Sequence, residues 1–211
     1  MKAAITPTIT TDDSKEFEAQ MKRIASFADG VHLDYADGEF APTKTLPIAE
    51  TWRTDDLITH AHIMYQNPLE HIDDIIHLEA DLVILHAESE DLKECLEMLN
   101  NVGVRTGVGL LPETSVADLQ DLDIDDLFDH VMIFGGKLGY QGGTADLTLL
   151  KKVEKLREVY PDVEIGWDGG VNAENAAQIV AAGVSVLNVG GYFKKAEDPK
   201  KAYATMQSLV S

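Results

Sequence analysis

A short segment of the sequence, VHLD at residues 31–34, carries a histidine and an aspartate between apolar residues. On a β-strand, side chains two residues apart point to the same face, so His32 and Asp34 would emerge together at the end of the strand. An imidazole beside a carboxylate can bind a metal ion or act in acid–base chemistry. Two unrelated polar residues at a strand end are the alternative. The elements that carry the other polar residues of the chain decide between these interpretations.

Short apolar runs recur along the chain at roughly 25-residue spacing, which indicates strands separated by helices. The expected strands are Ala3–Thr6, Gly30–Leu33, Leu57–Met64, Leu82–His86, Thr106–Leu110, Val131–Phe134, Val163–Trp167 and Val186–Val189. The expected helices are Ser14–Ala28, a short one near Pro47–Trp52, Leu69–Leu78, Asp91–Asn100, Ser115–Leu122, Leu147–Val159, Ala173–Ala182 and Pro199–Leu209. This alternation predicts an α/β fold in which residues 1–211 form a single (β/α)8 TIM-barrel domain. An open doubly wound sheet is the alternative.

A TIM barrel binds its ligands at the carboxyl ends of its strands, and the reactive residues of this chain collect there. They are Thr8 after the first strand, His32 and Asp34 on the second, His62 and Met64 on the third, His86 on the fourth and Asp168 on the seventh. Four of them form a mixed nitrogen and oxygen donor set: His32, Asp34, His62 and Asp168. Such a set suits one divalent metal ion, Zn, Fe, Mn or Co, with positions left for substrate oxygens.

Each of the remaining polar or sulfur-containing residues has a structural alternative. His86 either faces the ligand or fills the top of the barrel, and Met64 is either a core residue or an apolar lid over the reactive centre. His60 shares a strand face with His62 but lies one layer deeper, so we expect it to be structural. The histidines in helical or connecting stretches are expected at the surface: His71, His77 and His130.

Glycine pairs follow the last two expected strands, at residues 169–170 and 190–191. Glycine lets backbone amides approach an anion closely, and the loops after strands seven and eight of a TIM barrel often hold a phosphate. The segment GGKLGYQGG, residues 135–143, is a glycine-rich loop suited to closing over a small ligand. The expected substrate-binding residues are Thr8, Met64, His86, Gly142, Gly143, Gly169, Gly170, Gly190 and Gly191.

The composition excludes several classes of protein. The chain has 37 acidic and 17 basic residues and a formal net charge of −20, which argues against nucleic-acid binding. No apolar run reaches the about 20 residues of a membrane helix, and no segment has the pattern of a secretory leader. The single Cys95 cannot form an internal disulfide. We therefore expect a cytoplasmic protein without membrane or nucleic-acid partners, and we expect it to form a homo-oligomer.

Ordered motifs surround the candidate residues, at Pro7–Ile9, His32–Pro42, His62–Pro68 and Asp168–Asn172. In these segments the chain resembles the ribulose-phosphate 3-epimerase family, whose corresponding patterns include P-S-I-L, H-x-D-x-M-D-G-x-F-x-P and H-L-M-V-x-x-P. The resemblance extends over essentially the whole length and includes the fourth strand with His86. It implies one divalent metal ion held by His32, Asp34, His62 and Asp168, and a small-molecule sugar phosphate as substrate. It also implies that both aspartates are catalytic acid–base groups.

The chain departs from the family pattern around the position of the sugar. Ala36 replaces a methionine, and Gly191 stands where serine is usual. The segment after the fifth strand reads Leu-Pro-Glu-Thr at residues 111–114 instead of N-P-G-T, and the loop at residues 138–143 differs from P-G-F-G-G-Q. These departures bear on the identity of the substrate more than on the type of reaction.

Epimerisation next to a ketone needs a base on one face of the carbon and an acid on the other. Asp34 and Asp168 could supply both, with a metal ion stabilising the enediolate between the two proton transfers. The expected reaction is the interconversion of D-ribulose 5-phosphate and D-xylulose 5-phosphate. The alternatives are a 3-epimerase of another ketose phosphate, such as a hexulose 6-phosphate, a carbon–carbon lyase that uses Lys137 as a Schiff-base amine, and a barrel that binds sugar phosphates without turnover.

Overall fold

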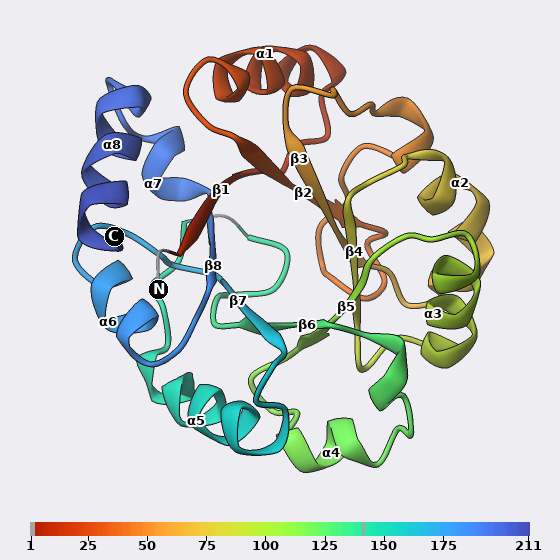
Figure 1. Ribbon diagram of the computed structural model, residues 1–211. Coiled ribbons are helices and arrows are strands. Elements are labelled where there is room, and N and C mark those ends of the chain that lie inside the picture. Colours follow the sequence, from red (N-terminus) through yellow and green to blue (C-terminus); the bar gives the residue numbers. More distant parts are fainter. Residues whose placement is uncertain (1–2, 141) are drawn as a thin grey trace.

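The computed structural model describes residues 3–140 and 142–211, which form a closed barrel of parallel strands surrounded by helices (Figure 1). The strands pair in the order of the sequence, and β8 closes the barrel against β1. Their bounds are β1 Ala4–Ile9, β2 Gly30–Ala36, β3 Ile58–Met64, β4 Leu82–His86, β5 Thr106–Leu110, β6 His130–Phe134, β7 Glu164–Asp168 and β8 Val186–Val189. The TIM barrel expected from the sequence is confirmed, and the open sheet is wrong.

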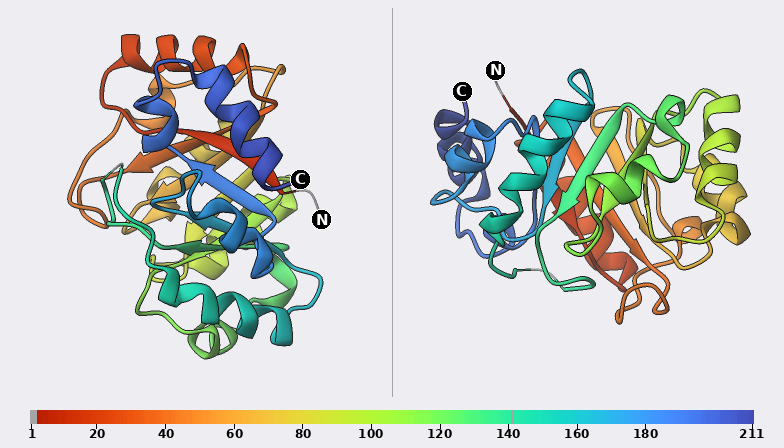
Figure 2. Two further views of the ribbon diagram at one scale, coloured as in Figure 1. Left: turned by 90° about the vertical axis from the view of Figure 1, so that its left-hand side faces the viewer. Right: turned by 90° about the horizontal axis from the view of Figure 1, so that it is seen from below.

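The helices lie around the outside of the barrel (Figures 1 and 2). They are α1 Ser14–Ala25, α2 Ile72–His77, α3 Leu92–Asn101, α4 Val116–Gln120, α5 Leu150–Val159, α6 Ala176–Ala181, α7 Gly191–Lys194 and α8 Pro199–Leu209. Short 3-10 helices occur at Ile48–Glu50, Pro68–His71, Asp125–Leu127 and Leu147–Leu149. The sequence did not indicate α7, because it is a single turn that follows β8 directly.

Local sequence signals explain how the helices begin and pack. The side chain of Asp13 accepts a hydrogen bond from the backbone N–H of Glu16 (2.8 Å) and caps α1. The buried residues of α1 are Phe17, Met21 and Ile24, at the spacing of one helical face. At the other end of the chain, the N–H of Ala3 donates to the carbonyl of Val210 (3.3 Å), so the two ends of the described chain lie together (Figure 2).

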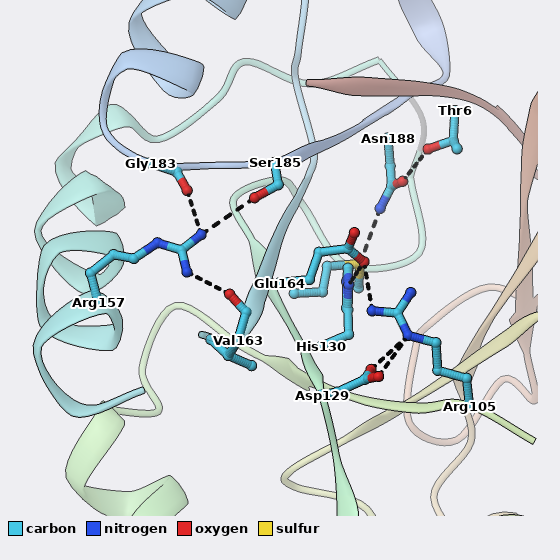
Figure 3. A network of polar contacts seen from close by, with 11 residues as sticks. Thr6, Arg105, Asp129, His130, Arg157, Val163, Glu164, Gly183, Ser185 and Asn188 are labelled. Atoms are coloured by element: carbon cyan, nitrogen blue, oxygen red, sulfur yellow. Dashed lines mark hydrogen bonds and ion pairs between the residues drawn. The ribbon is translucent and has the colours of Figure 1, made fainter. Parts of the chain in front are cut away.

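A polar network occupies the amino-terminal end of β6 and β7 (Figure 3). Arg105 donates to both carboxylate oxygens of Asp129 (2.7 and 2.9 Å) and to Glu164 (3.0 Å). Nδ1 of His130 lies 2.9 Å from the same oxygen of Glu164. The network joins the loop before β6 to β7 and holds His130 inside the barrel.

The expected surface position of His130 is therefore wrong, since the residue is fully buried. The reason is that β6 begins one residue earlier than the apolar run suggested, so His130 becomes its first residue. A Cβ on Gly166 of the neighbouring strand would lie 2.6 Å from Nε2 of His130. A glycine opposite the imidazole thus makes room for it in the interior.

Over residues 3–140 and 142–211, the structure contains no helix that is both long and apolar enough to cross a lipid bilayer.

Candidate metal centre and active site

Three strands bring the predicted donor residues together at the carboxyl end of the barrel. Asp34 on β2 lies directly opposite His62 in the register of β3, and barrel closure places Asp168 of β7 beside them. Nδ1 of His62 lies 2.9 Å from Oδ1 of Asp34 and 3.7 Å from Oδ2 of Asp168. One ligand atom from each of His32, Asp34, His62 and Asp168 lies within 4.8 Å of the others. The four-residue cluster predicted from the sequence thus exists.

The cluster has the chemistry of a divalent metal site. Both imidazoles are fully buried, and both carboxylates are largely so. Nδ1 of His32 makes no hydrogen bond with any described residue, and its Nε2 lies 3.4 Å from Asp34 without hydrogen-bond geometry. A buried polar atom left unpaired costs about 1–3 kcal/mol. A cation bound by the imidazoles and carboxylates would remove that cost, so the residues present fit a metal ion of the mixed nitrogen and oxygen class.

The two carboxyl groups have opposite pKa shifts. Burial by itself would raise the pKa of Asp34, but the adjacent His32 and His62 outweigh burial and hold that pKa well below its ordinary value. Burial, together with the charge of Asp34, raises the pKa of Asp168 to about 6. The hydroxyl of Thr10 also donates a hydrogen bond to Oδ2 of Asp34 (2.5 Å). Environments that shift the pKa values of two neighbouring carboxyl groups in opposite directions are typical of acid–base pairs.

A cavity of about 220 Å³ opens in front of both aspartates. Two threonines, an asparagine and two apolar side chains form its inner wall: Thr8, Thr10, Asn188, Met64 and Phe134. Its outer part is lined by the loops after β6, β7 and β8, including Gly142, Gly143, Gly169, Gly170, Gly190, Gly191 and Lys195. Of the substrate-binding residues expected from the sequence, all except His86 line this cavity.

Comparison with known proteins is decisive at this point, since residues 4–193 match the ribulose-phosphate 3-epimerase family. The chain belongs to this family. It is 29% identical to ribulose-phosphate 3-epimerase of Bacillus subtilis, over 96% of this chain and 97% of the relative. It is 25% identical to the cytoplasmic isoform of ribulose-phosphate 3-epimerase from Oryza sativa, over 99% of this chain and 94% of the relative.

Solved structures show the same fold at lower sequence identity. A 3-hexulose-6-phosphate synthase superposes with a TM-score of 0.69 at 17% identity, covering 99% of this chain and 100% of that one. The N-(5'-phosphoribosyl)anthranilate isomerase of Pyrococcus furiosus superposes with a TM-score of 0.65 at 15% identity, covering 99% and 98%. These likenesses concern the barrel and not the reaction.

The glycines of this family member have a packing role that the sequence did not reveal. Gly169 and Gly170 have positive φ angles of 105° and 70°, a region that favours glycine. A Cβ on Gly169 would lie 2.2 Å from the amide nitrogen of Gly136, and one on Gly170 would lie 2.1 Å from that of Ala145. The loop after β6 therefore rests directly on the turn after β7. Gln141 of the predicted closing loop lies outside the described residues.

His86 lies behind the metal cluster and not in the cavity. Its Nε2 is 2.8 Å from Nε2 of His62, and the ring is fully buried. Burial lowers the pKa of His86 to about 4. Glu88 lies near the other ring nitrogen of His86, with its Oε2 3.3 Å from Nδ1. Sequence reasoning missed Glu88, because it follows the end of β4, where the alternating pattern no longer applies.

Lys195 is the second residue that the sequence analysis missed. It is the single lysine or arginine among the described residues that line the cavity. Its Nζ lies 3.6 Å from the position that a Cβ would have on Gly142. Its neighbours in the sequence, KKAEDPKK at residues 194–201, have the composition of an exposed surface, so nothing marked this lysine as special.

Lys137, the candidate Schiff-base amine of the lyase alternative, is placed differently. Its Nζ lies 4.4 Å from the centre of the Tyr140 ring, in a cation–π contact. Tyr140 lines the cavity, whereas Lys137 does not. Its ammonium group thus lies against Tyr140 and is not part of the cavity lining.

Proposed function

We propose that this protein is a metal-dependent ketose-phosphate 3-epimerase that interconverts D-ribulose 5-phosphate and D-xylulose 5-phosphate. The observation that carries the proposal is the pair Asp34 and Asp168, which face one cavity within a metal-donor cluster and have opposite pKa shifts. The curated relatives named above carry this activity in their names, which supports the same substrate here.

The two aspartates divide the proton transfers at C3 between them. Asp34 is ionised and takes the proton of C3 from one side, while Asp168, with a pKa raised to about 6, gives a proton from its protonated form to the opposite side of the carbon. In the reverse reaction the two residues exchange roles. A divalent cation held by His32, Asp34, His62 and Asp168 would supply positive charge beside the oxygens of the sugar, on which negative charge develops. Met64 and Phe134 provide an apolar wall that keeps water from the reacting carbon.

Deuterium incorporation tests the proposed reaction. We expect xylulose 5-phosphate formed from ribulose 5-phosphate in D₂O to carry deuterium at C3. Asp34 removes the original proton, and Asp168, which exchanges its own proton with solvent, supplies the new one. Product without solvent label would contradict the two-base assignment. A metal-loaded protein that leaves ribulose 5-phosphate unchanged, assayed beside a hexulose 6-phosphate, would contradict the substrate assignment.

Lys195 is expected to bind the phosphate group in a chain whose net charge of −20 repels anions. The substitution Lys195→Met should raise KM for ribulose 5-phosphate about tenfold or more, in line with the loss of one charged hydrogen bond, and should leave kcat nearly unchanged. Inhibition by inorganic phosphate should weaken by a similar factor.

Lys194→Met is the matched control for this prediction. Lys194 pairs with Glu16 (3.1 Å) and does not line the cavity, so its removal should leave KM and phosphate inhibition near the wild-type values. Equal kinetic constants for Lys195→Met and Lys194→Met would show that Lys195 does not contact the phosphate.

A further inference from the structure

The imidazole of His62 faces two different groups with its two nitrogens. Nδ1 points to the carboxylates of Asp34 and Asp168, at 2.9 and 3.7 Å. Nε2 lies 2.8 Å from Nε2 of His86. A histidine that binds a metal through one nitrogen carries its proton on the other, and that proton needs an acceptor. For His62 the acceptor is therefore a second imidazole and not a carboxylate or a carbonyl.

An imidazole accepts at Nε2 only when its own proton lies on Nδ1. Nδ1 of His86 and Oε2 of Glu88 lie 3.3 Å apart, an ion-pair distance, and neither atom has a hydrogen-bond partner among the described residues. A carboxylate accepts a hydrogen bond but does not donate one, so this contact favours a proton on Nδ1 of His86. With the proton of His86 on Nδ1, its Nε2 is free to accept from His62. The opposite arrangement would place a proton on Nδ1 of His62, in front of the metal site.

The loop after β5 fixes the position of Glu88. Oε1 of Glu88 accepts a hydrogen bond from the amide of Leu111 (3.0 Å) and another from the hydroxyl of Thr114. Packing also restrains the imidazole of His86, since the ring of Phe40 lies against it with centroids 4.8 Å apart and an interplanar angle of 38°. On the other side, a Cβ on Gly109 would lie 3.2 Å from the His86 ring. The ring thus has little freedom to turn away from either partner.

We propose that Glu88 and His86 are positioning residues that hold His62 in the tautomer whose Nδ1 is free to bind the metal ion. The inference rests on the proposed function for the presence of the metal, but it concerns the chain's own hydrogen bonds. These contacts form a chain: the loop after β5 holds Glu88, Glu88 faces His86, and His86 faces His62. A segment outside the cavity is thereby connected to the metal centre.

The substitution Glu88→Gln tests the proposal sharply. The amide oxygen of the glutamine is expected to keep the hydrogen bonds from Leu111 and Thr114, so its NH₂ group would face Nδ1 of His86 and donate to it. That change reverses the hydrogen bond between the two imidazoles and favours the His62 tautomer with its proton on Nδ1, where it donates to Asp34 (2.9 Å) and competes with the metal ion. We expect the Kd for Co²⁺ or Zn²⁺, measured by competition with a chromophoric chelator, to rise by about 10- to 100-fold.

Controls separate this effect from a loss of folding. Glu90→Gln changes an exposed carboxylate of the same loop, which accepts from Gln66 (3.3 Å), and should keep the wild-type Kd. Long-range ¹H–¹⁵N NMR of the Zn²⁺-loaded proteins should show the proton of His86 on Nδ1 in the wild type and on Nε2 in Glu88→Gln. If Glu88→Gln does not fold, Thr114→Val, which removes one anchor of Glu88, should raise the Kd severalfold.

The outcomes distinguish this inference from the proposed function. A Glu88→Gln protein, or in its place a Thr114→Val protein, with the same Kd and the same His86 tautomer as Glu90→Gln would overturn the positioning role, whatever the enzyme activity. A wild-type protein that binds no divalent cation would overturn it too. A wild-type protein that binds metal and loses affinity on Glu88→Gln, but does not epimerise ribulose 5-phosphate, would leave the positioning role standing and contradict the proposed reaction.

Discussion

The Asp168→Asn protein is expected to lose epimerase activity by about 10²–10⁴-fold in kcat, the range that a positioned acid–base group contributes. Asp168 has a pKa raised to about 6 by burial and by the charge of Asp34, so it can both release and take up a proton close to neutral pH. An asparagine preserves the size of the side chain but has no such proton. Steady-state kinetics in both directions would measure the loss.

A second measurement separates the proton-transfer role of Asp168 from its place in the donor set. With one base intact, the Asp168→Asn protein should still exchange the C3 proton of one of the two epimers with solvent, through Asp34, without forming the other epimer. The metal content of the variant, measured in parallel, shows whether exchange is tested on a loaded protein. Asp162→Asn, at an exposed position, is the matched control. Epimerisation at the wild-type rate by loaded Asp168→Asn would rule out the acid–base role.

The sequence predicted the barrel and most of the site for the same reason. In a parallel barrel the carboxyl ends of all strands meet at one rim, so residues remote in sequence become neighbours once the strand ends are known. His32, Asp34 and His62 could be placed because they alternate with apolar residues on strands that are easily identified. Asp168 could be placed because a glycine pair follows it at once.

The features that the sequence missed depend on contacts outside the strand pattern. Whether His86 faces the cavity or lies behind His62 depends on which way its ring turns, and the packing of Phe40 against it is a contact between residues far apart in the sequence. Glu88 and Lys195 lie in connections, where no periodicity indicates the direction of a side chain. His130 was misplaced because the apolar run that marks β6 begins at Val131, one residue after the strand itself.

Removal of the divalent metal ion is expected to abolish epimerase activity. Without the cation, the cluster holds no positive charge to stabilise the negative charge that develops on the oxygens of the sugar when C3 loses its proton. Dialysis against a chelator, followed by titration with Zn²⁺, Fe²⁺, Mn²⁺ or Co²⁺, should restore activity in proportion to one metal ion per chain and identify the metal that works best. His32→Ala should lower the metal content and the activity together, whereas His77→Ala, at an exposed position, should change neither.

The pKa of Asp168 also sets the direction of the pH dependence of metal binding. A carboxyl group with a pKa of about 6 carries a proton below that pH, and this proton competes with the cation for the same oxygens. Below about pH 6 the apparent metal affinity should therefore fall by up to about tenfold for each pH unit from this group, and chelation should become faster. Above that pH the contribution of Asp168 levels off, because the group is already ionised. A metal affinity unchanged between pH 7 and pH 5 would show that the ion does not bind at Asp168. For the removal experiment, full activity of the metal-free protein would show that no metal is needed.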